Sequence, residues 1–268
     1  MTETWLGLSK KVFIVTGGGS SGIGAAIVDK LLSLGAIVYN ADLKNNEKKD
    51  DALFFVQTDV TDAEEVNDLV AKVIATQGRI DGLVNNAGIN LPRLLVDAQQ
   101  PHSKFEFTTA DFNKMFSVNV KSVFLVAQAV ARQLVKQKEG VIVNLSSEAG
   151  LEGSQGQSIY SATKGAINGL TRSWAKELGE FNVRVVGVAP GIMEATGLRT
   201  LAYEEALAYT RHKTVAQIRA GYRSTTTTPL GRSGHLYEVA DLVAYYLSKR
   251  ASYITGVTTN IAGGKSRG

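Results

Sequence analysis

Tyr160 and Lys164 are the residues of this sequence whose types and spacing most directly suggest acid–base chemistry. They lie four positions apart on a segment with helical periodicity, so their side chains share one helix face and can meet. A phenol with an ordinary pKa of about 10 is a poor base at neutral pH, and a neighbouring ammonium favours the phenolate. We therefore interpret the pair as an acid/base unit, although a solvated helix face can show the same spacing by chance.

A serine upstream favours the catalytic interpretation. Ser147 follows the apolar run 141–145 and precedes Tyr160 by 13 residues. If that run is a buried strand, the serine and the tyrosine converge at the carboxyl end of a sheet, where open α/β folds bind their ligands. Ser146 occupies the adjacent position and is the competing serine.

The stretch GGGSSGIG at residues 17–24 predicts a dinucleotide-binding turn, because glycines let the backbone turn sharply and approach a pyrophosphate. By itself this pattern also fits a flexible turn. Asp42, however, lies 18 residues beyond Gly24, at the end of the next apolar run. A carboxylate there accepts hydrogen bonds from ribose hydroxyls and repels a 2′-phosphate, so we expect NAD rather than NADP, with nearby Lys44 working against that preference.

These residues need a framework of alternating strands and helices, and the apolar pattern supplies one. The expected strands are residues 11–16, 36–41, 53–57, 81–85, 141–145, 183–188 and 257–261. The expected helices are residues 23–32, 63–77, 112–137, 158–178 and 237–248. Strands separated by helix-length segments indicate right-handed βαβ units, so we predict a doubly wound parallel sheet of the Rossmann type.

The alternation is interrupted once. Between Gly191 and Pro229 it lapses into a segment that contains four successive threonines. A long interruption inside a compact domain is usually a binding element, so we expect residues 192–229 to form a lid. No domain boundary is visible, and we predict a single α/β domain over residues 1–268 with this lid insertion.

Composition excludes several classes of function. The 268 residues are 44% hydrophobic and carry a net charge of +4 without a clustered basic patch, so no nucleic-acid partner is expected. The absence of cysteine excludes disulfides and agrees with a cytoplasmic protein. No apolar run reaches the roughly 18–20 residues that span a bilayer, so no membrane contact is expected. The three histidines are scattered, and we expect no metal.

Further motifs accompany these residues: Asp59-Val60, the run Asn85 to Gly88, Asn119 and Pro190-Gly191. With them, the chain resembles the short-chain dehydrogenase/reductase family over essentially its whole length. The resemblance implies a catalytic set of Ser147, Tyr160 and Lys164, with Asn119 anchoring a water linked to the lysine. It also implies that NAD is held by Gly18, Ser21, Gly22, Ile23, Asp42, Asp59, Val60, Asn86, Ala87, Gly88, Tyr160, Lys164, Pro190, Gly191 and Thr196.

Two spacings depart from the family pattern. Four residues separate Gly17 from Gly22 where the family has three, so either Gly18 takes the role of the first glycine or the loop bulges. The interval from Pro190 to Thr196 is also one residue longer than usual. Thr196 is nevertheless the residue that the resemblance places against the nicotinamide carboxamide.

Residues 90–97, 146–157, 197–200 and 253–268 resemble the sorbitol-phosphate dehydrogenases within this family. That resemblance implies reversible hydride transfer between D-sorbitol 6-phosphate and D-fructose 6-phosphate. A sugar phosphate requires cationic donors and polar groups for its hydroxyls. The substrate candidates are Arg93, Glu148, Glu152, Gln157, Arg199, Arg211, Lys213, Lys265 and Arg267.

Among these candidates we expect the phosphate to be held by cations of the lid and the C-terminal tail, namely Arg199, Lys265 and Arg267, with Arg93 next. Alternative functions are another reductase of the family, such as a polyol dehydrogenase or a 3-oxoacyl-carrier-protein reductase, and a dinucleotide-sensing protein without turnover. The helices 112–137 and 158–178 resemble the pair through which the family forms tetramers, so a homotetramer is expected.

Overall fold

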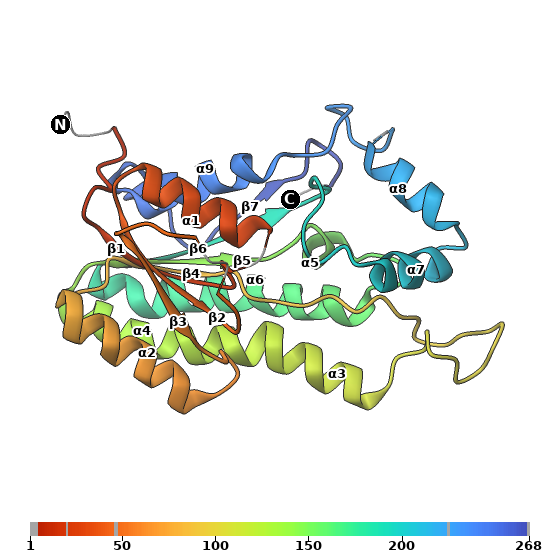
Figure 1. Ribbon diagram of the computed structural model, residues 1–268, viewed down its shortest axis with the longest axis horizontal. Coiled ribbons are helices and arrows are strands. Elements are labelled where there is room, and N and C mark those ends of the chain that lie inside the picture. The colour runs from red at the N-terminus through yellow and green to blue at the C-terminus, as the bar shows by residue number, and fades with distance from the viewer. Residues whose placement is uncertain (1–4, 20, 46–47, 224–225, 267–268) are drawn as a thin grey trace.

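Seven parallel strands form the central sheet of the protein, which a computed structural model describes for residues 5–19, 21–45, 48–223 and 226–266. Their order across the sheet is β3-β2-β1-β4-β5-β6-β7. The prediction of a doubly wound α/β fold is confirmed (Figure 1). The strands are β1 (Val12–Thr16), β2 (Ile37–Asp42), β3 (Leu53–Gln57), β4 (Gly82–Asn85), β5 (Gly140–Leu145), β6 (Val183–Pro190) and β7 (Thr258–Ile261).

Helices cover both faces of this sheet (Figure 1). On one face lie α1 (Ile23–Ser33) and α9 (Leu236–Leu247). The other face carries α2 (Ala63–Gln77), α3 (Thr109–Phe116), α4 (Ser122–Gln137) and α6 (Ser158–Leu178). The remaining helices are α5 (Ala149–Glu152), α7 (Leu201–Thr210), α8 (Val215–Arg223), the π-helical turn Ser117–Lys121 and the 3-10 turns Gly179–Phe181 and Lys249–Ala251.

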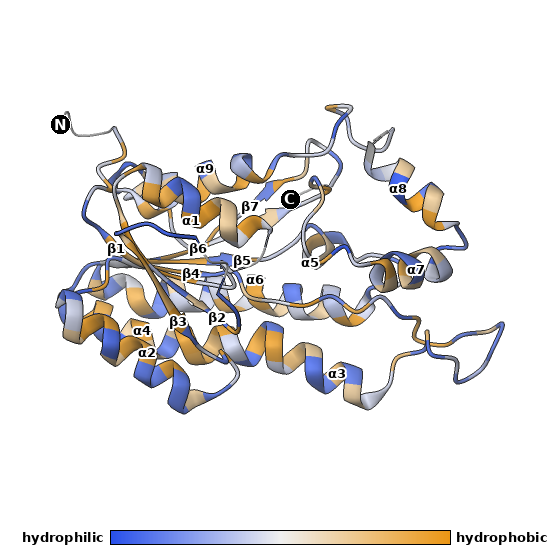
Figure 2. Cartoon of the chain, viewed as in Figure 1, coloured by the Kyte–Doolittle hydropathy of each residue, from blue (hydrophilic) through white to orange (hydrophobic). Residues whose placement is uncertain are grey.

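The strands are apolar on both faces, as parallel strands between two helical layers must be (Figure 2). In β1, Phe13 and Val15 belong to the core beneath α1 and α9, whereas Val12 and Ile14 belong to the core beneath α2 and α4. All four side chains are buried. The alternation of side chains along a strand therefore supplies both cores at once.

The predicted helix over residues 112–137 is interrupted by the π-helical turn Ser117–Lys121, and its first part begins earlier, at Thr109. Thr108 caps that start, because its hydroxyl accepts from the Asp111 N–H while the Asp111 carboxylate accepts from the Thr108 N–H. π-helical turns occur frequently at functional sites. Here the turn carries Asn119, whose side chain is completely buried.

Two helices lie within the segment predicted to be irregular. The helix α7 was missed because its apolar residues do not form one stripe: Ala206, Leu207 and Ala208 are buried in succession, and Leu201 is exposed. In α8, Gly221 weakens the helical signal. Both helices lie beyond the carboxyl ends of the strands, and α7 lies next to the loop of residues 90–107 (Figure 1).

The loop 90–107 is fastened to α7. The buried Asp97 carboxylate accepts hydrogen bonds from the Tyr209 hydroxyl at 2.7 Å and the Ser103 hydroxyl at 2.6 Å. The rings of Phe105 and Tyr209 stack with their centroids 4.0 Å apart. These contacts, which we call the Asp97 clasp, join two segments that are more than a hundred residues apart in the sequence.

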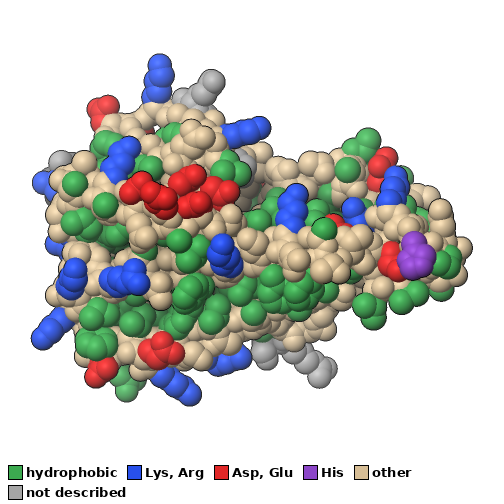
Figure 3. Space-filling model, turned by 90° about the horizontal axis from the view of Figure 1, so that it is seen from below, with side chains coloured by type: hydrophobic (Ala, Val, Ile, Leu, Met, Phe, Trp, Pro, Cys, Tyr) green, Lys and Arg blue, Asp and Glu red, His purple; other side chains and the backbone are tan. Residues whose placement is uncertain are grey.

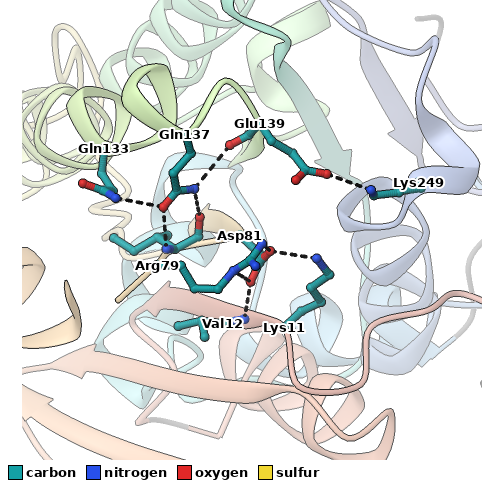
Figure 4. Close-up of polar contacts among 9 residues, drawn as sticks. Lys11, Val12, Arg79, Asp81, Gln133, Gln137, Glu139 and Lys249 are labelled. Carbon is teal, nitrogen blue, oxygen red and sulfur yellow. Dashed lines mark hydrogen bonds and ion pairs between the residues drawn. The ribbon is translucent and has the colours of Figure 1, made fainter. Parts of the chain in front are cut away.

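At the amino ends of the strands, a separate polar network ties the sheet to α4 (Figure 4). Asp81 accepts from the Lys11 ammonium, the Val12 N–H and the Arg79 guanidinium. Gln137 of α4 bonds to both backbone groups of Ile80. This end of the sheet is closed by structural contacts, which leaves the carboxyl end for ligands.

Candidate active site

A cavity of about 880 Å³ opens where the strands β1, β4, β5 and β6 end. That volume lies in the upper part of the range for small-molecule sites, roughly 300–1,000 Å³. The cavity brings together the predicted catalytic residues Ser147, Tyr160 and Lys164. It is also lined by Ser21, Gly22, Ile23, Asp42, Asp59, Val60, Asn86, Ala87, Gly88, Pro190, Gly191 and Thr196, all predicted to bind the cofactor.

Ser147, not Ser146, is the serine that reaches the tyrosine. A side-chain hydrogen bond joins Ser147 to the Tyr160 hydroxyl. The Ser146 hydroxyl is buried and instead donates to the Lys164 carbonyl at 3.2 Å. This geometry favours Ser147, the serine that the family resemblance implies, over Ser146.

Lys164 lies beneath the tyrosine and donates to the Leu145 carbonyl at 2.7 Å. Its Nζ is 5.7 Å from the centre of the Tyr160 ring. Burial lowers the pKa of the Lys164 ammonium to about 8, because a buried site disfavours the charged form. Most of the ammonium therefore remains protonated at neutral pH.

The pKa of Tyr160 is raised, whereas the sequence led us to expect a lowered value. Burial of the phenol is the main cause and outweighs the opposing effect of the hydrogen bond from Ser147. The expected neighbour, Lys164, directs its ammonium to a backbone carbonyl. In this state the phenol keeps its proton and is suited to act as a general acid.

Asn119 lies behind the cavity wall and not on it. Its Oδ1 accepts from the Ile89 N–H at 2.8 Å, and its Nδ2 donates to the Ile89 carbonyl, also at 2.8 Å. The Nδ2 also donates to the hydroxyl of Thr163, the residue before Lys164. Asn119 is thereby a positioning residue that connects the segment after β4 to the catalytic helix.

The glycine turn fits a dinucleotide because its backbone approaches neighbouring segments so closely that side chains would not fit there. A Cβ on Gly17 would lie 2.8 Å from the Ala87 Cα, and Gly17 has a φ of +72°. A Cβ on Gly24 would lie 2.3 Å from the Gly17 carbonyl oxygen, so only glycine lets α1 start this close to β1. The start of α1, at Gly22 and Ile23, faces the cavity with the positive end of its dipole.

Gly17, and not Gly18, lines the cavity. Gly18 is buried, and its N–H donates to the Asn40 Oδ1 at 3.0 Å. The Gly19 N–H donates to the Asp42 Oδ2 at 2.8 Å, so the glycine turn is tied to the end of β2.

Asp42 and the residues after β3 close the other end of this part of the cavity. The Asp42 Oδ1 accepts from the Leu43 N–H, so both oxygens of its carboxylate are oriented by the backbone. Asp59 and Val60 line the wall beside it. A carboxylate held at the end of β2 fits the two hydroxyls of an adenosine ribose.

The short chain dehydrogenase family matches residues 11–206. Sorbitol-6-phosphate 2-dehydrogenase of Klebsiella pneumoniae is 60% identical over 268 residues, which cover 99% of this chain and all of that protein. The chain belongs to the short-chain dehydrogenase family.

Solved structures agree with this assignment. Aldohexose dehydrogenase of Thermoplasma acidophilum has a TM-score of 0.83 at 25% identity and covers 97% of this chain and 95% of its own. The 3-ketoacyl-(acyl-carrier-protein) reductase of Brucella melitensis, solved with NADH, has a TM-score of 0.81 at 27% identity. The match covers 97% of this chain and 100% of that protein. As a short-chain dehydrogenase, this chain is an oxidoreductase that works with a nicotinamide dinucleotide.

Beyond the catalytic residues, the cavity of this short-chain dehydrogenase is lined by seven of the residues that were predicted as substrate candidates: Glu148, Glu152, Gln157, Arg199, Arg211, Lys213 and Lys265. Lys265 pairs with the Glu148 carboxylate at 2.6 Å and lies 3.6 Å from that of Glu152. Arg199 packs over the Tyr222 ring at 3.3 Å and donates to the Met193 carbonyl. Both cations therefore already have partners.

Two other predicted substrate residues are not brought to the cavity. The Arg93 guanidinium donates to the carbonyl of its neighbour Pro92, and the Arg93 N–H donates to the Gly156 carbonyl. Arg93 thus supports the loop before α6 and does not line the cavity. Arg267 lies outside the described residues.

The lining residues that were not predicted from the sequence include Tyr203, Tyr222 and Asn90. Tyr203 and Tyr222 come from α7 and α8, two helices that were not predicted, and Tyr203 accepts a hydrogen bond from the Gln157 amide at 3.0 Å. Asn90 lies just after the recognised Asn85 to Gly88 motif, and its buried Oδ1 has no partner among the described residues. Its position after the motif was the available signal.

Within the described parts of the chain, no helix has the length and apolar character needed to cross a membrane. Among the same residues, no group of three His, Cys, Asp or Glu side chains is placed to hold a metal ion.

Proposed function

We propose that the protein is an NAD-dependent dehydrogenase that interconverts D-sorbitol 6-phosphate and D-fructose 6-phosphate. The observation that carries the proposal is the Ser147–Tyr160 hydrogen bond above Lys164, at the centre of a cavity with a dinucleotide cradle on one side and cations on the other. Among relatives, the 60% identical protein from Klebsiella pneumoniae is a sorbitol-6-phosphate 2-dehydrogenase.

The proposal for NAD rests on Asp42. Its oriented carboxylate would hold the adenosine ribose and oppose a 2′-phosphate with like charge. The start of α1 would hold the pyrophosphate, and Thr196 would meet the nicotinamide carboxamide. When bound, the nicotinamide supplies or accepts the hydride at the second carbon of the sugar.

The residues of the chain then manage the proton. Ser147 donates a hydrogen bond to the carbonyl oxygen of the ketose and orients it beside Tyr160. As the hydride reaches the carbon, the phenol gives its proton to the developing alkoxide, and solvent restores that proton. In the reverse direction the phenolate takes the alcohol proton, with the Lys164 ammonium stabilising the negative charge.

We also propose that residues 1–268 form one cytoplasmic domain and that residues 192–229 form its lid. The lid is supported by the hydrogen bond from the Gly197 N–H to the Ser21 carbonyl at 2.6 Å, which holds this segment against the glycine turn. Homotetramer formation is supported by the apolar side chains that gather along the face of α3 and α4 (Figure 3). Phe112 and Phe124 on this face are 42% and 43% exposed.

A spectrophotometric screen tests the proposed substrate and cofactor together. The oxidation of NADH and of NADPH is followed with fructose 6-phosphate, fructose and an acetoacetyl thioester. We expect the highest kcat/KM for NADH with fructose 6-phosphate. A preference for the thioester would instead assign the protein to the 3-oxoacyl-carrier-protein reductases, and a preference for NADPH would contradict the role given to Asp42.

A further inference from the structure

Among the described residues, six cationic side chains line the cavity, and the phosphate of a sugar phosphate requires one or more whose charge is available. They are Lys114, Lys164, Arg199, Arg211, Lys213 and Lys265. Lys164 belongs to the catalytic set and donates to a backbone carbonyl. The phosphate partner therefore has to be found among the remaining five.

Of the three cations that were expected to hold the phosphate, Arg267 lies outside the described residues, and Arg199 and Lys265 are already engaged in other contacts. The Lys265 ammonium lies within 4 Å of two carboxylates, Glu148 and Glu152, so its surroundings carry a net negative charge that repels a phosphate. The Arg199 guanidinium has its face against the Tyr222 ring and one NH group on the Met193 carbonyl. Rearranging either cation would break contacts that already satisfy it.

Arg211 and Lys213 differ because no carboxylate neutralises them. Within the described part of the chain, neither side chain forms an ion pair. Arg211 donates only to neutral oxygens, the Ser154 hydroxyl at 3.0 Å and the Gln155 carbonyl at 3.4 Å. The exposed Lys213 stands two residues further on, so two positive charges lie on one turn between α7 and α8.

This turn is fixed in place relative to the catalytic tyrosine. The Gln155 amide donates to the Thr210 carbonyl at 3.1 Å, and a Cβ on Gly156 would lie 2.2 Å from the Thr210 hydroxyl. Residues 154–157 lead directly into α6, which carries Tyr160. The Asp97 clasp holds the other side of α7, so the Arg211 turn cannot move without disturbing both anchors.

The geometry points to Arg211 and Lys213 as the phosphate-binding residues of this cavity. They would bind the phosphate of a phosphorylated ketose or polyol while Tyr160 addresses the second carbon. This inference rests on the proposed function. Lys114 is the competing cation, but it contributes a single charge from the exposed face of α3, whereas the turn after α7 carries two.

The test compares fructose 6-phosphate with fructose in the double variant Arg211→Gln/Lys213→Gln, with saturating NADH. A lost charge-assisted contact corresponds to about a ten- to hundredfold change in affinity. We therefore expect KM for fructose 6-phosphate to rise by at least this factor with kcat little changed, and kcat/KM for fructose to stay at the wild-type value. Arg211→Lys should retain most of the preference.

A charge-matched control is Lys72→Gln/Lys136→Gln, which removes two exposed lysines of α2 and α4 outside the cavity and should leave the phosphate preference unchanged. Should the double variant fail to fold, the single change Lys213→Gln alters only an exposed side chain and serves in its place. Unchanged preference in a folded variant, or its loss in Lys114→Gln alone, would overturn the inference. A wild-type protein that does not reduce fructose 6-phosphate would instead reject the proposed function.

Discussion

The proton of Tyr160 determines how the site can act in each direction. Because burial raises the pKa of this phenol, the protonated form prevails in the unliganded enzyme, and ketone reduction needs that form. Oxidation of the alcohol needs the phenolate. We therefore expect kcat/KM for oxidation to increase with pH on the alkaline side and kcat/KM for reduction to decrease there.

Replacing Tyr160 with Phe removes the acid while preserving the packing of the ring. We expect reduction of fructose 6-phosphate to fall by about 10²–10⁴-fold, the usual contribution of general acid–base catalysis. NADH binding, measured by the fluorescence of the bound dinucleotide, should be retained. Near-normal turnover in this variant would mean that another group delivers the proton.

The sequence predicted that the candidate catalytic residues lie together, but it did not predict their electrostatics. The spacing of Ser147, Tyr160 and Lys164 carries the information that the fold brings them together. Whether the tyrosine pKa rises or falls depends on burial and on where the Lys164 ammonium points, and neither is visible in spacing. The position of Gly18 could not be predicted for the same reason, because its N–H donates to the side chain of Asn40, which lies on β2 and is distant in the sequence.

Among the elements, the Asp97 clasp does most to hold α7 near the site. Hydrogen bonds from Ser103 and Tyr209 lower the pKa of Asp97 from 3.8 to about 2, because both favour the carboxylate. A carboxyl group whose pKa is lower in the folded state stabilises the fold at pH values above its unfolded pKa. That contribution is lost as the pH falls through the folded value.

The variant Asp97→Asn tests this contribution. Its free energy of unfolding, from urea titrations at several pH values, should lie below that of the wild type by a constant amount above about pH 4. The difference should shrink as the pH falls toward about 2, where wild-type Asp97 also becomes neutral. A difference that does not change with pH would show that the charge of Asp97 does not stabilise the clasp.

Strands and helices with a clear apolar periodicity could be predicted from the sequence, whereas helices that depend on tertiary contacts could not. The strands β1 to β7 and the helices α1, α2, α6 and α9 follow the apolar pattern within one or two residues. The helix α7 has no single apolar stripe because it packs between the loop 90–107 and the rest of the lid segment. The π-helical turn at Asn119 follows from side-chain bonds to Ile89, which no local pattern encodes.

On the scale of the whole molecule, the two ends of the sheet differ: one is closed by structural contacts and the other carries the cavity. The amino ends are closed by the network around Asp81 and Gln137, and the carboxyl ends carry the cavity (Figure 4). The chain order of the strands places the cofactor cradle on β1 and β2 and the proton chemistry on β5 and α6. Residues 192–229, the proposed lid, would add the cations that a phosphorylated substrate requires.

The position of the transferred hydride tests this account most directly. The enzyme is incubated with fructose 6-phosphate and NADH that carries deuterium at both C4 positions of the nicotinamide, and the product is analysed by NMR and mass spectrometry. We expect D-sorbitol 6-phosphate with one deuterium at the second carbon. A product without deuterium at that carbon, its epimer mannitol phosphate, or no hexitol phosphate at all would contradict it.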